Sequence, residues 1–394
     1  MARRSRKKKQ PAVSLPDDLV MEILARVPYR SLCRFKCVSQ SWQALCSDPD
    51  LRKMSPQTLS GFFCHARKER DDGRDSGVRF INLSGKGRPL VDPDFLFLHD
   101  FVSIGLQLVN CCSSLLLCKC FKTSPHPWDA DWVVCNPATE KWTVLPATEA
   151  LHCSKSFTIR LGFDPATPSR FEAFLLKQGS LLDGRITGVA IYSSETGQWI
   201  SMKSEWGDET CVDDNDSQFV FFNDTLHFTT FHSARDDFCV EDSRCECDYS
   251  LVTLDTEGKT WRKFPLPYHD TSFCSIGQSQ GRLHAMHIDH GENQFILSVW
   301  LLEDYATGQW TLMHTANVPQ LFGRHCRYRG EFCSLIAVHP ECNVIFLIDG
   351  VTSMLVSYNM DDRKVRVICS AREYYHLPFP TYIPCFAEWP SDVI

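Results

Sequence analysis

The chain has 394 residues, of which 43% are hydrophobic and 23% charged, and this balance is typical of a folded protein and excludes disordered and collagen-like chains. No run of 18 apolar residues occurs, so we expect no membrane-spanning helix and no membrane partner. The formal net charge is −7 even though residues 1–10 hold six basic side chains and no acidic one. The remainder is therefore distinctly acidic, which argues against a fold that coats nucleic acid, and we expect no nucleic-acid partner.

The 20 cysteines are the second unusual feature of the composition. A secreted disulfide scaffold would need an export signal, but the basic start is not followed by an apolar core before Pro11 and Pro16. We therefore expect reduced, mostly buried thiols that act as small apolar side chains. A location in the nucleus, the cytoplasm or both follows from this interpretation, and the glycosylation sequons at Asn82, Asn215 and Asn223 would then be irrelevant.

Residues 1–12 form a polar, basic arm with too little apolar surface to build a core, so we expect a disordered tail. Basic clusters of this kind occur in nuclear import signals, and the alternative is a solvated tail with no function of its own. The length of the chain allows two or three domains, although a β-propeller could take up most of it as one.

Residues 13–54 predict a compact set of helices. Ser14 precedes a proline and two acidic residues, which is the pattern of a helix start, and apolar residues then follow at helical spacing over about 16–27. A second helix capped by Ser31 and a third over 39–46 are expected to follow. A unit this small can bury only part of its own apolar surface. We therefore expect the apolar face that remains exposed to dock on another polypeptide. The alternative is a helical cap packed on the following domain.

This segment closely resembles the F-box of plant F-box proteins, because about a dozen positions agree in order and spacing. The matching runs are Leu15-Pro16-Asp17-Asp18-Leu19, Glu22-Ile23-Leu24, Val27-Pro28, Ser31-Leu32, Arg34-Phe35-Lys36-Cys37-Val38-Ser39 and Trp42. The resemblance implies binding to the Skp adaptor of a cullin-RING ubiquitin ligase. The side chains expected to bind that adaptor are Leu15, Pro16, Leu19, Ile23, Leu24, Leu32, Phe35, Val38 and Trp42.

Residues 55–75 are rich in charge and hold proline and glycine, so we interpret them as a linker with a strand-like segment at 59–64 inside it. Beyond the linker the pattern changes to short apolar runs separated by glycine, proline, asparagine and aspartate. Such runs predict β-strands joined by turns.

A repeat emerges from these strands. Each copy is an apolar strand, a tight polar turn and a second strand opened by an aromatic residue, which predicts a β-hairpin. The copies end at Trp142, Trp199, Trp261 and Trp310, and a weaker one without tryptophan reaches Val365. Leu-Pro or Phe-Pro follows two of these tryptophans. A period near 50 residues with several strands per unit is typical of a propeller, in which each blade covers the apolar faces of its neighbours.

These repeats look like the F-box-associated, kelch-like domain of plant F-box proteins, and we assign residues 76–392 to it. The predicted fold class is α+β multidomain: a small all-α F-box module followed by an all-β, propeller-like domain of five or six blades. The segment 379–389 is expected to complete a blade with an early strand at about 77–83. An open or irregular sandwich of the same hairpins is the alternative architecture.

Several clusters resemble sites of chemistry, but their spacing favours structural explanations. The run 277–281 fits the nucleophile-elbow pattern, yet that chemistry needs a helix after the serine, and here a strand follows. Side chains alternate on a strand, and structural zinc needs paired ligands, so the histidine and cysteine groups do not predict metal sites. We therefore expect no catalytic residue, no cofactor and no metal. The groups are His284, His287, Asp289 and His290; Cys239, Cys245, Cys247 and His232; and Cys111, Cys112, Cys118 and Cys120.

Two acidic stretches interrupt the repeats, and both are expected in long loops. They could attract a basic partner surface by electrostatic steering, or they could simply keep a β-rich protein in solution. The first holds Glu205, Asp208, Glu209, Asp213, Asp214 and Asp216, and the second holds Asp236, Asp237, Glu241, Asp242, Glu246 and Asp248.

The functional hypothesis is a substrate receptor whose helices hold the Skp adaptor, and through it cullin, while the β-domain presents an unknown target protein for ubiquitination. Such a subunit needs no nucleophile, because tethering alone makes the transfer effectively intramolecular. The first alternative is a propeller enzyme, such as an oxidase or a sugar-active protein. The second is an adaptor-bound protein that acts outside ubiquitination.

Overall fold

The computed structural model has two compact units, Met1–Gln57 and Thr58–Ile394, and each is described by itself. No helix in the described part of the chain has the length and apolar character needed to cross a bilayer. The structure describes residues 15–27, 29–48, 51, 58–65, 77–83, 91–122, 130–148, 151, 157–179, 184–207, 210–212, 218–232, 248–268, 274–290, 295–323, 333–372 and 379–386.

The first unit contains three short helices, α1 (Asp17–Leu24), α2 (Tyr29–Phe35) and α3 (Gln40–Cys46). Helix α3 confirms the helix predicted over 39–46. Its N-cap is Ser39, whose side chain accepts a hydrogen bond from the Trp42 backbone N–H at 3.3 Å.

The first two helices differ from their predicted bounds. Helix α1 is shorter than predicted, since Arg26 and Val27 donate to carbonyls only three residues back. Its N-cap is Pro16, which provides no side-chain bond, and Ser14 lies outside the described residues. Helix α2 begins at Tyr29, two residues before the predicted cap Ser31.

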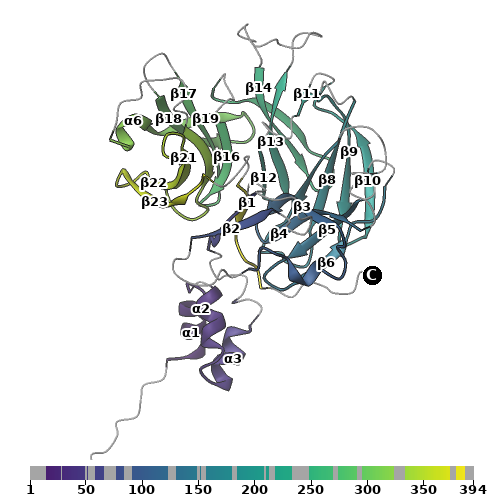
Figure 1. Cartoon of the computed structure of the whole chain (residues 1–394), viewed down its shortest axis with the longest axis vertical. Helices are drawn as coiled ribbons and strands as arrows, with labels where there is room; N and C mark the ends of the chain where they lie inside the picture. The colour runs from purple at the N-terminus through teal and green to yellow at the C-terminus, as the bar shows by residue number, and fades with distance from the viewer. Residues whose placement is uncertain are drawn as a thin grey trace, which may run out of the picture. The chain divides into compact units, whose positions relative to one another are not determined.

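In the described residues of the second unit, the strands form six antiparallel sheets, which we call blades 1–6 (Figure 1). Blade 1 comprises β1 (Gly61–His65), β2 (Val78–Asn82) and β24 (Thr381–Tyr382). Blade 2 comprises β3 (Gly105–Cys112), β4 (Leu115–Phe121), β5 (Ala130–Asn136) and β6 (Lys141–Val144). Blade 3 comprises β7 (Phe157–Gly162), β8 (Glu172–Gln178), β9 (Ile186–Ser193) and β10 (Gln198–Lys203).

The remaining three blades have the same antiparallel pattern, and most have four strands. Blade 4 comprises β11 (Thr210–Cys211), β12 (Phe219–Phe222), β13 (Thr225–His232), β14 (Asp248–Asp255) and β15 (Trp261–Pro265). Blade 5 comprises β16 (Cys274–Ser279), β17 (Arg282–His290), β18 (Phe295–Asp304) and β19 (Gln309–Asn317). Blade 6 comprises β20 (Cys333–Val338), β21 (Val344–Asp349), β22 (Met354–Asn359) and β23 (Lys364–Ser370). The short segments η1 (Leu96–Leu98) and α6 (Val318–Leu321) lie before β3 and after β19.

The blades form a ring in which neighbouring blades contact one another through one strand of each. Strand β3 contacts β24 and β7, β12 contacts β7 and β16, and β16 contacts β20. Apolar clusters fill the spaces between successive blades, and one of them joins blade 6 to blade 1 through Phe62 and Phe346. The fold is therefore a six-blade propeller, which decides between the five and six blades predicted and excludes the irregular sandwich.

Blade 1 closes the ring by joining segments from both ends of the β-domain. Strand β1 pairs with β2 on one side and with β24 on the other, where Gly61 lies opposite Tyr382. The pairing of an early strand with the C-terminal segment is thus confirmed, but β1, from the segment interpreted as a linker, stands between the two predicted partners. Phe63 of β1 is fully buried against the rings of Phe80, Phe95 and Tyr382.

The tryptophan hairpins connect neighbouring blades by hydrogen bonds. The indole N–H of Trp199 in blade 3 donates to the carbonyl of Pro146 in blade 2 at 3.0 Å. In the same way Trp310 in blade 5 donates to the carbonyl of Pro265 in blade 4 at 3.1 Å. The apolar-Pro pair of the sequence repeat therefore supplies the acceptor for the tryptophan of the next blade. Trp261 differs, since its N–H donates to Gly258 of its own turn.

Candidate functional site

Helix α1 of the first unit carries exposed apolar side chains on one face. Leu19 and Ile23 are one helical turn apart and are 46% and 51% exposed, and Leu15, just before the helix, is 54% exposed. We call Leu15, Leu19 and Ile23 the α1 patch. Two large apolar side chains on one face of a short helix, with a third just before it, would gain free energy by being covered, which is the property of a docking surface.

The other predicted adaptor-binding residues are in three environments. Pro16 is exposed next to the α1 patch, and Val38 is 66% exposed. Leu24 and Leu32 are 2% and 0% exposed, so both belong to the core and have no surface to offer a partner as the chain stands.

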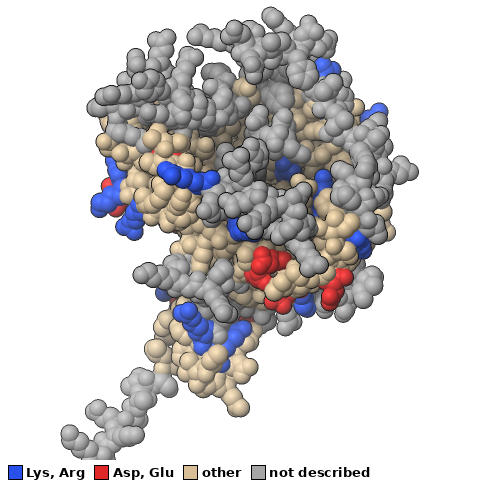
Figure 2. Space-filling model, viewed as in Figure 1, with Lys and Arg blue, Asp and Glu red and all other residues tan. Residues whose placement is uncertain are grey.

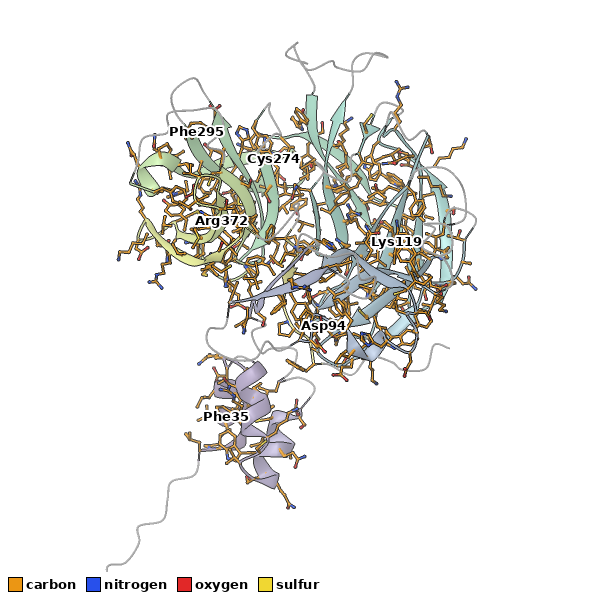
Figure 3. All side chains as sticks on the ribbon, in the orientation of Figure 1. Phe35, Asp94, Lys119, Cys274, Phe295 and Arg372 are labelled. Carbon is orange, nitrogen blue, oxygen red and sulfur yellow. The ribbon has the colours of Figure 1, made fainter. Side chains whose placement is uncertain are left out.

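Phe35 and Trp42 form the third environment. The two ring centroids lie 5.6 Å apart in an edge-to-face contact that joins α2, where Figure 3 labels Phe35, to α3, and both side chains are half-buried. An aromatic pair of this kind adds about 0.5–1.5 kcal/mol beyond its area burial. Each ring therefore supports the helical unit and leaves part of its surface for a partner.

In the β-domain, the nucleophile-elbow pattern proves to be a hairpin turn. Gln280 and Gly281 adopt positive φ angles of 50° and 72° between β16 and β17, as a tight turn between strands requires. The Ser279 hydroxyl is buried and donates to the carbonyl of His339 at 2.7 Å. Among the residues that the structure describes, no histidine side chain bonds this hydroxyl, and the serine links blades 5 and 6.

The histidine group on β17 is dispersed as the strand alternation predicted. His287 is buried and stacks on the ring of Tyr268 at 4.9 Å, whereas Asp289 is exposed. His284 is half-buried and its Nδ1 lies 3.2 Å from the carbonyl of Arg282. Within the described ranges, no three His, Cys, Asp or Glu side chains are placed to hold a metal ion.

Two of the four blade 2 cysteines, Cys111 and Cys112, bond to backbone carbonyls. Cys111 donates to the carbonyl of Thr381 at 3.2 Å and Cys112 to that of Phe163 at 3.6 Å. Burial raises the pKa of Cys112 to about 12, so its thiol is protonated near neutral pH. The cysteine group at 239–247 lies outside the described residues.

Charged groups of the β-domain are distributed unevenly. On the face drawn in Figure 2, the Lys and Arg side chains of described residues are scattered and form no continuous stripe, and the Asp and Glu side chains in view lie in separate groups on the β-domain. Glu205 is described, but most of the two acidic stretches, 208–209, 213–217 and 233–247, lies outside the described residues.

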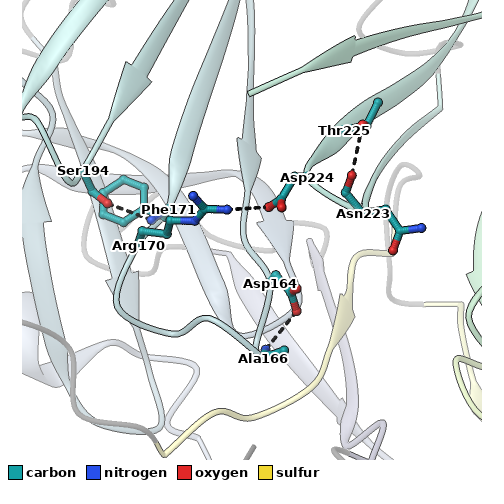
Figure 4. Close-up of polar contacts among 8 residues, drawn as sticks. All are labelled: Asp164, Ala166, Arg170, Phe171, Ser194, Asn223, Asp224 and Thr225. Carbon is teal, nitrogen blue, oxygen red and sulfur yellow. Dashed lines mark hydrogen bonds and ion pairs between the residues drawn. The ribbon is translucent and has the colours of Figure 1, made fainter. Parts of the chain in front are cut away.

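A polar seam joins blades 3 and 4. Arg170 pairs with Asp224, in the turn between β12 and β13, at 2.8 Å, and the Phe171 N–H donates to the Ser194 hydroxyl at 2.7 Å (Figure 4). Glu172 follows directly and is only 5% exposed. Burial raises the pKa of its carboxyl to about 7; the positive charge of Arg170 lowers it, and nearby acids raise it further.

We expect Glu172→Gln to flatten the dependence of stability on pH. The folded-state pKa of about 7 lies above the ordinary 4.5, so the stability tied to the protonated carboxyl is complete below pH 4.5 and is lost as the pH rises through 7. When the pH rises from about 5 to about 8, the unfolding free energy of the unchanged protein should fall by about 2 kcal/mol more than that of Glu172→Gln.

Urea denaturation at both pH values measures this difference. Glu303→Gln is the matched control, because it removes an exposed carboxylate that pairs with Arg282, and it should follow the unchanged protein. Equal pH dependence of Glu172→Gln and the unchanged protein would contradict the assignment of Glu172 as the titrating group.

The two units therefore define an F-box protein with a six-blade β-propeller. Two family models match the chain: the F-box domain over residues 13–54, and the β-propeller of At3g26010-like F-box proteins over residues 104–383. The chain belongs to this family of F-box proteins.

Individual relatives agree with this assignment. F-box protein At5g07610 of Arabidopsis thaliana is 24% identical over 334 residues, which cover 77% of this chain and 71% of the relative. F-box protein At5g49610 of the same plant is 24% identical over 331 residues, which cover 80% and 82%. Among solved structures, the GH93 α-L-arabinofuranosidase of Fusarium graminearum matches 82% of this chain and 88% of its own, with 11% identity and a TM-score of 0.41.

Proposed function

We propose that this protein is the substrate-recognition subunit of a Skp-cullin-F-box ubiquitin ligase. The observation that carries the proposal is the α1 patch, an exposed apolar face on the segment that matches the F-box. In this role the helical unit binds the Skp adaptor, and through it cullin, while the propeller binds a target protein. The location that suits this role is the nucleus, the cytoplasm or both.

The mechanism is proximity. A target held by the propeller stays within reach of a ubiquitin-conjugating enzyme bound elsewhere in the ligase, so that transfer to a target lysine becomes effectively intramolecular. The subunit itself performs no covalent step in this proposal.

Reconstitution tests the proposal. The full chain mixed with purified Skp adaptor, cullin and RING subunit should elute as one stoichiometric complex in size-exclusion chromatography. A chain that binds the adaptor but never joins cullin would support the alternative role outside ubiquitination. A chain that ignores the adaptor would overturn the proposal itself.

A further inference from the structure

Trp142 differs from the other hairpin tryptophans. It is 37% exposed, whereas Trp199, Trp261 and Trp310 are all less exposed and donate their indole N–H groups to backbone carbonyls. The indole N–H of Trp142 has no hydrogen-bond acceptor among the described residues. An exposed tryptophan with an unused donor is unusual in a repeat whose other copies use that donor within the chain.

The position of Trp142 in the ring accounts for the difference. In blades 3 and 5 the acceptor is a proline carbonyl at the end of the outer strand of the preceding blade. Blade 2 follows blade 1, whose sheet ends at β2 within the described ranges, so no described fourth strand offers that carbonyl. Phe101 packs against Trp142 instead, with ring centroids 4.5 Å apart. The aromatic ring is thus supported while its donor stays unused.

The internal pairs show what kind of group fits such a tryptophan. Both acceptors belong to proline and follow a large buried residue, Leu145 or Phe264. Leu145 packs in the same apolar cluster as Trp199, and Phe264 in the same cluster as Trp310. The complement is therefore an extended apolar-Pro dipeptide, because a residue before proline is restricted to extended conformations.

The surroundings of Trp142 offer contacts for the rest of such a segment. Val144 lies two residues further along β6, on the same side of the strand, and is 36% exposed. Strand β6 is the outermost strand of its sheet, so one backbone edge is unpaired in that sheet. Lys122 holds its ammonium 3.7 Å from the centre of the Phe101 ring and pairs with Asp131 at 2.8 Å, which adds a polar rim.

We propose that Trp142 is a docking point for an extended apolar-Pro segment of the bound target protein, whose backbone carbonyl accepts the indole N–H. The inference rests on the receptor role proposed above, since it assigns a partner chemistry to the propeller. It uses in trans the contact that Trp199 makes with Pro146 within the chain.

The test uses the full chain with 15N-labelled tryptophan and without adaptor. The probe is the acetylated, amidated peptide Thr-Val-Leu-Pro-Ala-Thr, which copies residues 143–148. The indole resonance missing from the spectrum of Trp142→Phe identifies Trp142 among the 10 tryptophans. Addition of peptide should shift that resonance saturably, with a Kd of about 1 mM for so short a segment, and leave the resonances of Trp199 and Trp310 in place.

Two variants separate the hydrogen bond from the ring. Trp142→Phe keeps an aromatic ring without the donor, and peptide binding, followed by fluorescence polarisation of labelled peptide, should weaken about fivefold. Trp142→Ala should lose binding by more than about tenfold. Val367→Ala on β23, a position 61% exposed in blade 6, is the matched control and should bind as the unchanged protein does.

Three outcomes would overturn the inference. The first is that millimolar peptide does not shift the Trp142 resonance. The second is that Trp142→Phe and Trp142→Ala both bind the peptide as tightly as the unchanged protein does. The third is that this chain forms a dimer, which Trp142→Ala dissociates. The last would assign the surface to a second copy instead. Because adaptor is absent from the measurement, a failed peptide titration leaves adaptor binding untouched, and a failed adaptor complex leaves the titration interpretable.

Discussion

Ile23→Asp should abolish co-purification of the full chain with the Skp adaptor. Ile23 is 51% exposed in the α1 patch, so an aspartate there remains solvated in the free protein and should not disturb its fold. In a complex that covers the patch, the same carboxylate would be buried without a partner, at a cost of several kcal/mol. We therefore expect adaptor affinity to fall by at least about 100-fold, which titration calorimetry measures.

A matched variant distinguishes lost docking from a general effect of charge. Ile200→Asp places the same substitution on β10 of blade 3, where Ile200 is 62% exposed, and adaptor affinity should not change. Leu24 is a poor choice for this test, because its side chain is 2% exposed and a charge there would unfold the helices. Unchanged adaptor affinity in Ile23→Asp would reject the α1 patch as the docking surface.

The sequence predicts the hairpins of the propeller well because each hairpin is local. An apolar strand, a polar turn and an aromatic residue lie within a dozen positions, and the structure places Trp142, Trp199, Trp261 and Trp310 in the outer strands of four blades. Blade 1 lacks this signal. Its strands come from 61–65, 78–82 and 381–382, and a pairing over 300 residues of chain leaves no periodic trace. The count of five or six could therefore not be decided from the repeat alone.

The α1 patch was only partly predictable, for a different reason. Helical spacing shows that Leu19, Ile23 and Leu24 lie near one side of α1, but not which of them faces the other helices. The structure buries Leu24 and leaves Leu19 and Ile23 exposed. The sequence does not predict the exposed indole N–H of Trp142 either. Whether a hairpin tryptophan finds an acceptor depends on the preceding blade and not on the hairpin itself.

Closure of the ring through β1 leads to the largest expected effect on stability. Phe63 is 0% exposed and packs against Phe80, Phe95 and Tyr382, side chains that come from three segments of blade 1 and its connection to blade 2. Phe63→Ala removes this ring from a site where β-sheet backbone on both sides limits collapse, so a cavity should remain. We expect the unfolding free energy to fall by about 3–5 kcal/mol.

Urea denaturation followed by tryptophan fluorescence measures this loss. Leu312→Ala on β19 is the control, because Leu312 is 52% exposed and its truncation should change stability by less than about 0.5 kcal/mol. If β1 couples the two ends of the ring, Phe63→Ala should also expose 379–386 to proteolysis before the rest of the propeller unfolds, since β24 pairs with β1 alone in its sheet. A loss below about 1 kcal/mol, with no such early cleavage, would mean that blade 1 contributes little to holding the ring closed.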